Sequence, residues 1–141
     1  MTIHQSVERC RLAAIIAGDR MLDADAAARQ AEFGRILVRN ALAREDYHAA
    51  HAQLKALRRL AGSCREDAYE ARDAANDCEK HAAAVADARG VVAAAVATGQ
   101  WTKQAAYAAA QAQKRAEEAG RAHAHASIDW TVAKRRVEEA K

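Results

Sequence analysis

The sequence predicts an all-α protein, folded as a long antiparallel helical hairpin or a three-helix coiled-coil bundle. Its 141 residues include no proline, the residue that interrupts helices most strongly. Alanine, arginine, glutamate, glutamine and lysine fill most positions, and these are the strongest helix formers. Small apolar residues recur at alternating spacings of three and four, as in helices that pack in coiled-coil fashion.

Capping signals divide the chain into helices at about 3–61, 64–97 and 102–140. Thr2 followed by Gln5 resembles a capping box that starts the first helix. Gly62 can adopt the left-handed conformation that ends a helix, and Ser63 with Glu66 forms a second capping-box pattern. Gly99 and Thr102 give the next stop and start. If Gly99 is only a kink, the fold is a two-helix hairpin with a longer second helix.

The apolar seam and the charges support the predicted turn at Gly62-Ser63. The seam runs from Leu22 to Val96 without losing phase, and a new seam begins after Trp101. The first seam contains Leu22, Phe33, Ile36, Tyr47, Leu54, Leu57, Cys64, Cys78 and Val85, and the second contains Ala105, Ala112, Ala119, His123, Ala126, Trp130 and Val137. Folding back at residues 62–63 places Lys55 opposite Glu70, so opposite charges face each other.

The first predicted helix is longer than the other two, so residues 1–25 are expected to overhang the bundle. This segment is the most apolar part of the chain, and it either folds back at Gly18 or binds a partner protein. Trp101, a large aromatic residue at a predicted turn, is a further candidate anchor for a partner. The predicted partner-binding residues are Val7, Leu12, Ile15, Ile16, Met21, Leu22 and Trp101.

Composition narrows the class of protein to a single helical domain over residues 1–141. Alanine occupies 41 positions, so the core contains few large side chains and we expect a modest free energy of unfolding. The net charge is +3 with acids and bases interspersed, which argues against nucleic-acid binding. The apolar windows are too short to insert into a membrane. Three cysteines without paired spacing and the lack of a signal peptide favour the cytoplasm, or the periphery of the inner membrane.

Two groups of residues could carry chemistry, and a structural role is favoured for both. His48 and His51 stand three residues apart beside Glu45, but the paired motifs of helical metal sites are absent. The predicted register also brings Tyr47, Cys78 and His123 into one core layer, where a thiol and an imidazole could form a metal site or a nucleophile. We therefore predict no catalytic residue, no metal ligand and no cofactor.

The chain resembles the central-stalk proteins of type III secretion systems, flagellar FliJ and its injectisome counterparts, in length, composition and heptad pattern. The resemblance implies a coiled coil that sits in a hexameric export ATPase and reaches toward the export gate, with a role in protein transport and virulence. It transfers no functional residue, and the break near Gly99 departs from the two helices of that family. The alternatives are a small helical adaptor or chaperone and, less favoured, a metal- or thiol-dependent enzyme. Self-association is left open.

Overall fold

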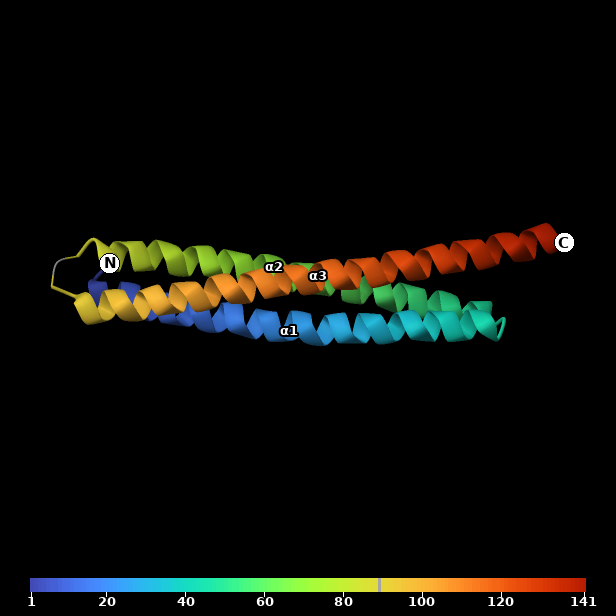
Figure 1. The fold of residues 1–141 in the computed structure, drawn as a ribbon, viewed down its shortest axis with the longest axis horizontal. Helices are drawn as coiled ribbons and strands as arrows, with labels where there is room; N and C mark the ends of the chain where they lie inside the picture. Colours follow the sequence, from blue (N-terminus) through green and yellow to red (C-terminus); the bar gives the residue numbers. More distant parts are fainter. Residues whose placement is uncertain (89) are drawn as a thin grey trace.

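The computed structural model describes residues 1–88 and 90–141, and it has three long helices packed side by side as a rod (Figure 1). The helices are α1 (Ile3–Ala43), α2 (Tyr47–Ala86) and α3 (Val92–Ala140). The chain reverses direction between successive helices, so α1 and α3 run parallel and α2 runs against both (Figure 1). The prediction of an all-α three-helix bundle is confirmed, whereas the predicted positions of both turns are wrong.

The first turn lies at residues 44–46 and not at Gly62-Ser63, which continue within α2. Glu45 adopts a positive φ of 59°, and the Asp46 carboxylate accepts a hydrogen bond from the Ala49 backbone N–H at 3.1 Å, so Asp46 caps α2. This turn makes α1 and α2 nearly equal, at 41 and 40 residues. The two helices can therefore pair along their whole lengths, which a first helix ending at residue 61 could not do.

The second turn lies between Ala86 and Val92 and includes Gly90, whose φ of 79° favours glycine. Gly99, the predicted stop, lies inside α3. The Thr98 hydroxyl donates to the Ala94 carbonyl at 2.9 Å, and the Thr102 hydroxyl donates to the Thr98 carbonyl at 2.8 Å. These threonines therefore bond back onto the preceding helical turn instead of starting a new helix.

The core is a seam of alanines with a few larger side chains, arranged in two clusters. Leu57 and Cys64 belong to the larger cluster, whereas Cys10 and Cys78 belong to a smaller one near the other end of the rod. Gly34 faces Leu57, and a Cβ at residue 34 would lie 3.1 Å from the Leu57 Cδ1 atom. Small residues of this kind allow helix backbones to approach closely. The most fully buried larger side chains are Leu57, Val38, Val85, Thr98, Cys10, Cys64 and Cys78.

The core confirms the predicted seams of α2 and α3 over most of their lengths and contradicts the seam predicted for α1. Buried positions on the predicted seams include Ala50, Leu57, Ala61, Cys64, Ala68, Ala71, Cys78 and Val85 in α2, and Ala105, Ala112, Ala119 and Ala126 in α3. In α1 the buried residues are almost all small, whereas Phe33 and Ile36 are 61% and 46% exposed. The three-and-four spacing from Leu22 through Phe33 and Ile36 predicted a seam on the face of α1 opposite to its buried residues.

Residues 1–25 do not overhang the bundle. Cys10 and Ala17 are fully buried, and Cys10 contacts both Cys78 of α2 and the Thr98 carbonyl of α3. The protruding segment is instead the end of α3, which continues past the turn between α1 and α2 (Figure 1). Its basic run, residues 134–136, is exposed.

Candidate functional site

The outer face of α1 carries most of the predicted partner-binding residues. Leu12, Ile15, Ile16 and Leu22 are between 46% and 61% exposed. Val7 is only partly exposed, and Met21 and Trp101 pack against the core cluster around Cys10. The structure therefore brings four of the seven predicted residues together on one surface and places Met21 and Trp101 in structural positions.

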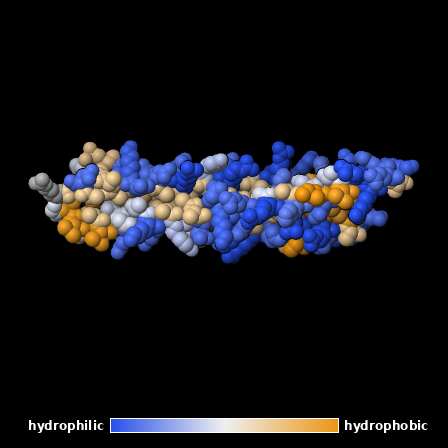
Figure 2. All heavy atoms as spheres, turned by 45° about the horizontal axis from the view of Figure 1, so that its top comes forward, coloured by the Kyte–Doolittle hydropathy of each residue, from blue (hydrophilic) through white to orange (hydrophobic). Residues whose placement is uncertain are grey.

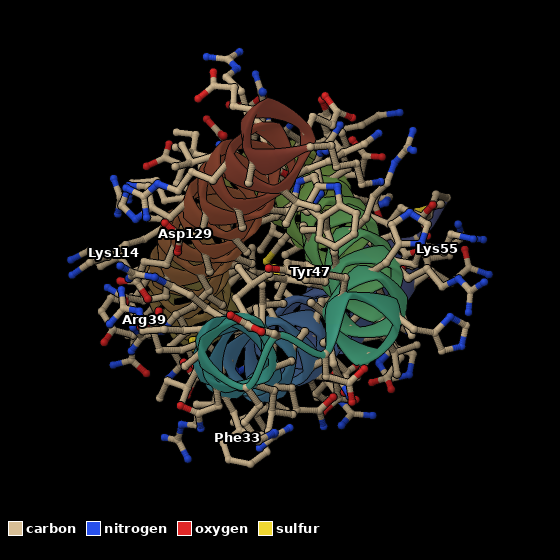
Figure 3. All side chains as sticks on the ribbon, turned by 90° about the vertical axis from the view of Figure 1, so that its right-hand side faces the viewer. Phe33, Arg39, Tyr47, Lys55, Lys114 and Asp129 are labelled. Atoms are coloured by element: carbon tan, nitrogen blue, oxygen red, sulfur yellow. The ribbon has the colours of Figure 1, made fainter. Side chains whose placement is uncertain are left out.

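Sequence reasoning missed the C-terminal half of this surface. Phe33 and Ile36 continue the same helical spacing and are exposed on the same side of α1. Phe33 points away from α2 and α3 (Figure 3). We define the outer stripe as the six large apolar residues Leu12, Ile15, Ile16, Leu22, Phe33 and Ile36. Their helical spacing was visible in the sequence and was interpreted as the core seam.

Both faces of α1 carry apolar residues. The inner face, which packs against α2 and α3, carries the small ones. Ala13, Ala17, Ala24 and Ala31 are among the buried positions, and they allow α1 to lie close to both other helices. Large residues on this face would separate the helices and leave the alanines of α2 and α3 without contacts. The large apolar side chains therefore face solvent. A surface of this kind is typical of a contact with another protein.

Other apolar surface is confined to separate places on the rod. Val92 and Val96 are 76% and 57% exposed at the start of α3. Figure 2 shows apolar side chains at the end of the rod that carries the α2–α3 turn, with mainly hydrophilic side chains over the middle of that face. Tyr107 and Ile128 of α3 are also exposed. The exposed apolar residues of α3 also include Val132 and are widely spaced along that helix. The outer stripe places its six large apolar side chains closer together, between residues 12 and 36.

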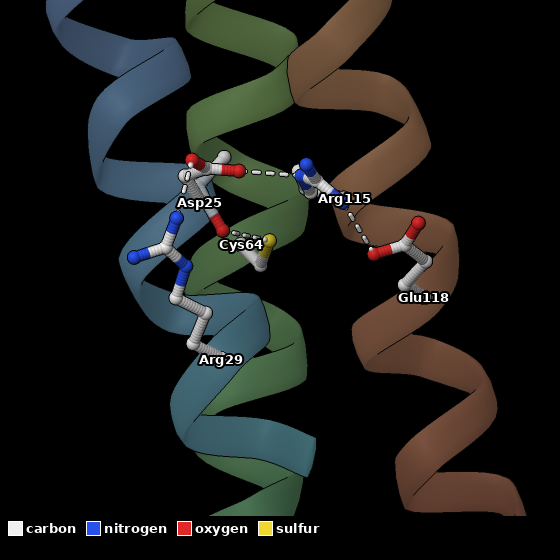
Figure 4. Close-up of polar contacts among 6 residues, drawn as sticks. Asp25, Arg29, Cys64, Arg115 and Glu118 are labelled. Atoms are coloured by element: carbon white, nitrogen blue, oxygen red, sulfur yellow. Dashed lines mark hydrogen bonds and ion pairs between the residues drawn. The ribbon is translucent and has the colours of Figure 1, made fainter.

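Ion pairs fix the position of α1 against its neighbours. Arg115 of α3 donates through Nε to the Asp25 carboxylate of α1 and through Nη1 to Glu118 at 2.9 Å (Figure 4). Arg20 of α1 lies 2.9 Å from the Glu70 carboxylate of α2. These pairs replace the predicted pairing of Lys55 with Glu70. Because all of these groups are partly exposed, we assign them to register and not to a large share of the stability.

The three cysteines are buried between helices. The Sγ atoms of Cys10 and Cys78 lie 2.7 Å apart, and the Cys64 thiol donates to the Ala24 carbonyl of α1 at 3.3 Å (Figure 4). Burial, with the neighbouring Cys78 thiol, raises the pKa of Cys10 to about 12. Burial, with the nearby Asp67 carboxylate, raises the pKa of Cys64 to about 11. These two thiols are therefore protonated and poorly nucleophilic near neutral pH.

The predicted layer of Tyr47, Cys78 and His123 is not formed. Tyr47 lies toward the bundle axis (Figure 3), with its ring centroid 6.5 Å from that of Trp130. Cys78 contacts Cys10 at the other end of the rod, and His123 lies 3.5 Å from the Ser127 hydroxyl. The layer depended on predicted turns at residues 62–63 and 100–101. The observed turns lie elsewhere, between Ala43 and Tyr47 and between Ala86 and Val92, and so they separate its members.

The two histidines that were weighed as metal ligands, His48 and His51, do not lie together at a site. His51 packs against Trp130 with ring centroids 5.2 Å apart, and His48 is exposed. Among residues 1–88 and 90–141, no group of three or more His, Cys, Asp or Glu side chains is arranged to hold a metal ion. Within the same residues, none of the helices combines the length and the apolar character needed to cross a bilayer.

Comparison with known proteins found no match to a family model, to a curated protein or to a solved structure.

Proposed function

We propose that the chain is a non-catalytic helical protein that binds a partner protein through the outer stripe of α1. The observation that supports this is the distribution of apolar residues in α1. Most of its alanines are buried in the bundle, whereas six large apolar side chains on the opposite face are 46% to 61% exposed. Covering such side chains is the main favourable term in protein association. A rigid helix of 41 residues also presents them at fixed spacing, which lowers the entropy lost on binding.

The test compares polar substitutions on the stripe with matched substitutions elsewhere. Tagged wild-type protein, a stripe variant with Ile15→Ser and Phe33→Ser, and a control with Tyr107→Ser and Ile128→Ser would be recovered from the native host. All four substituted side chains are substantially exposed, so helicity measured by circular dichroism should be unchanged. We expect bound proteins to be lost from the stripe variant and retained by the control. Equal recovery with all three proteins would contradict the proposal.

The assembly we propose first is the type III export apparatus, with the hexameric export ATPase and the export gate as partners. The chain's composition, length and heptad pattern support this, and its three helices depart from the two of the stalk proteins. A stalk should bind the purified export ATPase and stimulate ATP hydrolysis, and the stripe variant should do so less. An ATPase that neither binds the wild-type chain nor responds to it would exclude this assembly and leave the adaptor or chaperone hypothesis.

The structure determines how an adaptor role can be tested. Deleting residues 1–18 would remove Cys10, Ala13 and Ala17 from the core and would expose Cys78, so lost binding could reflect a damaged bundle. Point substitutions on exposed stripe residues avoid that ambiguity because they leave the buried face of α1 intact.

A further inference from the structure

We infer that the outer stripe binds a second copy of the same chain, with the two α1 helices antiparallel about a two-fold axis. This inference rests on the proposed function, because it takes the outer stripe as a protein-binding surface. The observation that supports it is the order of exposed residues along one side of α1. Eight of the exposed residues between 12 and 36 form a row with alternating spacings of three and four: Leu12, Ile15, Asp19, Leu22, Ala26, Arg29, Phe33 and Ile36. Ile16 of the outer stripe is also exposed and lies beside this row.

When the second copy runs in the opposite direction, each residue of this row faces a residue of matching or complementary character. Antiparallel α1 helices centred near residue 24 place Leu12 opposite Ile36 of the second copy and Ile15 opposite its Phe33. The same register places Leu22 opposite Ala26, a large side chain against a small one. Each contact occurs twice, as a two-fold interface requires. The alternating spacing gives the register of an antiparallel coiled coil, in which the two kinds of seam position face each other.

The two charges within the seam select the antiparallel orientation. Asp19 and Arg29 are both exposed, and the antiparallel register places each opposite the other in the second copy. A parallel arrangement in register would place Asp19 opposite Asp19 and Arg29 opposite Arg29, which repel. Opposite charges at these two positions therefore favour one orientation and disfavour the other.

The remaining acids near the two-fold axis are neutralised within their own chain. Asp23 lies 3.2 Å from Arg20, and Asp25 binds Arg115 of α3. The side of α1 that carries the stripe faces away from α2 and α3, as Phe33 shows (Figure 3). Arg29 itself lies 3.6 Å from Asp25 within α1, in a pair whose Arg29 side chain is exposed. A second rod can therefore approach without displacing a contact between the three helices.

The size of this surface implies a weak, concentration-dependent dimer. Residues 12–36 extend over roughly 37 Å of helix, and a helix face about 10–12 Å wide gives on the order of 900 Å² of interface for both copies together. This value is at the low end for specific complexes. We expect a dissociation constant between about 1 and 100 μM, in the range of transient associations.

The test is sedimentation velocity of the full chain over about 1–300 μM. We expect the wild-type protein to pass from monomer to dimer over this range. Asp19→Arg alone should weaken the dimer at least about tenfold, and Arg29→Asp alone should do the same, because each creates two like-charged pairs. The double swap should restore it. An equimolar mixture of the two single variants should also dimerise, since every pair across that interface is then Arg against Asp.

The control is Tyr107→Ser with Ile128→Ser, which changes exposed apolar residues of α3 and should leave the dimer unchanged. A chain that stays monomeric throughout, or a dimer that ignores both charge reversals, would overturn the inference. So would a mixture that dimerises no better than the single variants. The proposed function has a separate criterion: loss of a different protein from the Ile15→Ser, Phe33→Ser variant would support it even if the chain is monomeric.

Discussion

Burial of thiols between the helices makes the stability of the bundle sensitive to alkaline pH. The pKa of Cys10 rises to about 12 and that of Cys64 to about 11, whereas an unfolded cysteine titrates near pH 8.5. Between these values the unfolded chain has lost protons that the folded chain retains, so unfolding is favoured as the pH rises. At a pH below the pKa of the unfolded thiols, both the folded and the unfolded chain keep these protons. The thiols then no longer make the free energy of unfolding depend on pH.

We therefore predict that the free energy of unfolding falls from about pH 9 upward, beyond the effect of the other titrating groups. Urea denaturation at a series of pH values would measure it. The matched control replaces Cys10, Cys64 and Cys78 by alanine, and its pH profile should be flatter above pH 9. The same slope in both proteins would show that Cys10 and Cys64 do not titrate as their burial implies.

Two leucines test the difference between the inner and outer faces of α1. One packs against the inner face from α2, and the other lies on the outer face. Leu57 of α2 is fully buried against Gly34, whereas Leu22 of the outer stripe is 61% exposed. We predict that Leu57→Ala lowers the free energy of unfolding by about 2–5 kcal/mol, because it leaves a cavity in a core with few large side chains. Leu22→Ala should change it by less than about 0.5 kcal/mol.

Chemical denaturation at concentrations too low for association would give both values. A large loss from Leu22→Ala under those conditions would mean that Leu22 is buried within the monomer.

At the scale of helices, glycine substitutions distinguish the observed turns from the predicted ones. Gly62 lies inside α2, and a Cβ there would contact nothing within 4 Å. We predict that Gly62→Ala raises the free energy of unfolding by about 0.5–1 kcal/mol, because alanine loses less backbone entropy in a helix. Gly90→Ala should lower it by about 1 kcal/mol, since residue 90 has a positive φ.

Thermal or urea unfolding of the two variants would provide the comparison. The opposite result, with Gly62→Ala destabilising and Gly90→Ala stabilising, would place the turn at residue 62.

The sequence was sufficient for the helical class and for the seams of α2 and α3, but not for the turns. Gly62 with Ser63 and Gly99 with Thr102 carry familiar stop and start signals, yet both lie in continuous helix. The actual first turn contains neither glycine nor proline, and its only local signal is the capping residue Asp46. Each capping or glycine signal contributes only about 1 kcal/mol. This is less than the packing free energy that is lost when long helices of different length cannot pair along their whole lengths.

The outer stripe could be predicted only in part, for a related physical reason. Leu12, Ile15, Ile16 and Leu22 were identified because the first helix was expected to protrude, whereas they are exposed because α1 buries its alanines. Phe33 and Ile36 were assigned to the core by their three-and-four spacing with the other residues of the predicted seam. Hydrophobicity alone does not distinguish the two apolar faces of a helix. The small residues of the neighbouring helices decide which face can approach closely.

As a whole molecule, the monomer should behave as a rod. α3 contains 49 residues, which corresponds to a length of roughly 70 Å. We predict a radius of gyration of roughly 20 Å by small-angle X-ray scattering of the monomer, since a compact domain of this size would give about 14 Å. A value near the compact one would mean that the helices fold back on themselves in solution.

The odd number of helices places residues 1 and 141 at opposite ends of the rod (Figure 1). A tensile force applied to these two residues acts along the rod axis and loads the contacts between helices in shear. Many alanine contacts must then slide together, whereas in a two-helix hairpin, whose ends lie side by side, contacts separate one after another. The bundle should therefore resist pulling along its axis more strongly than its sparse core suggests, and a single-molecule pulling experiment would measure that resistance.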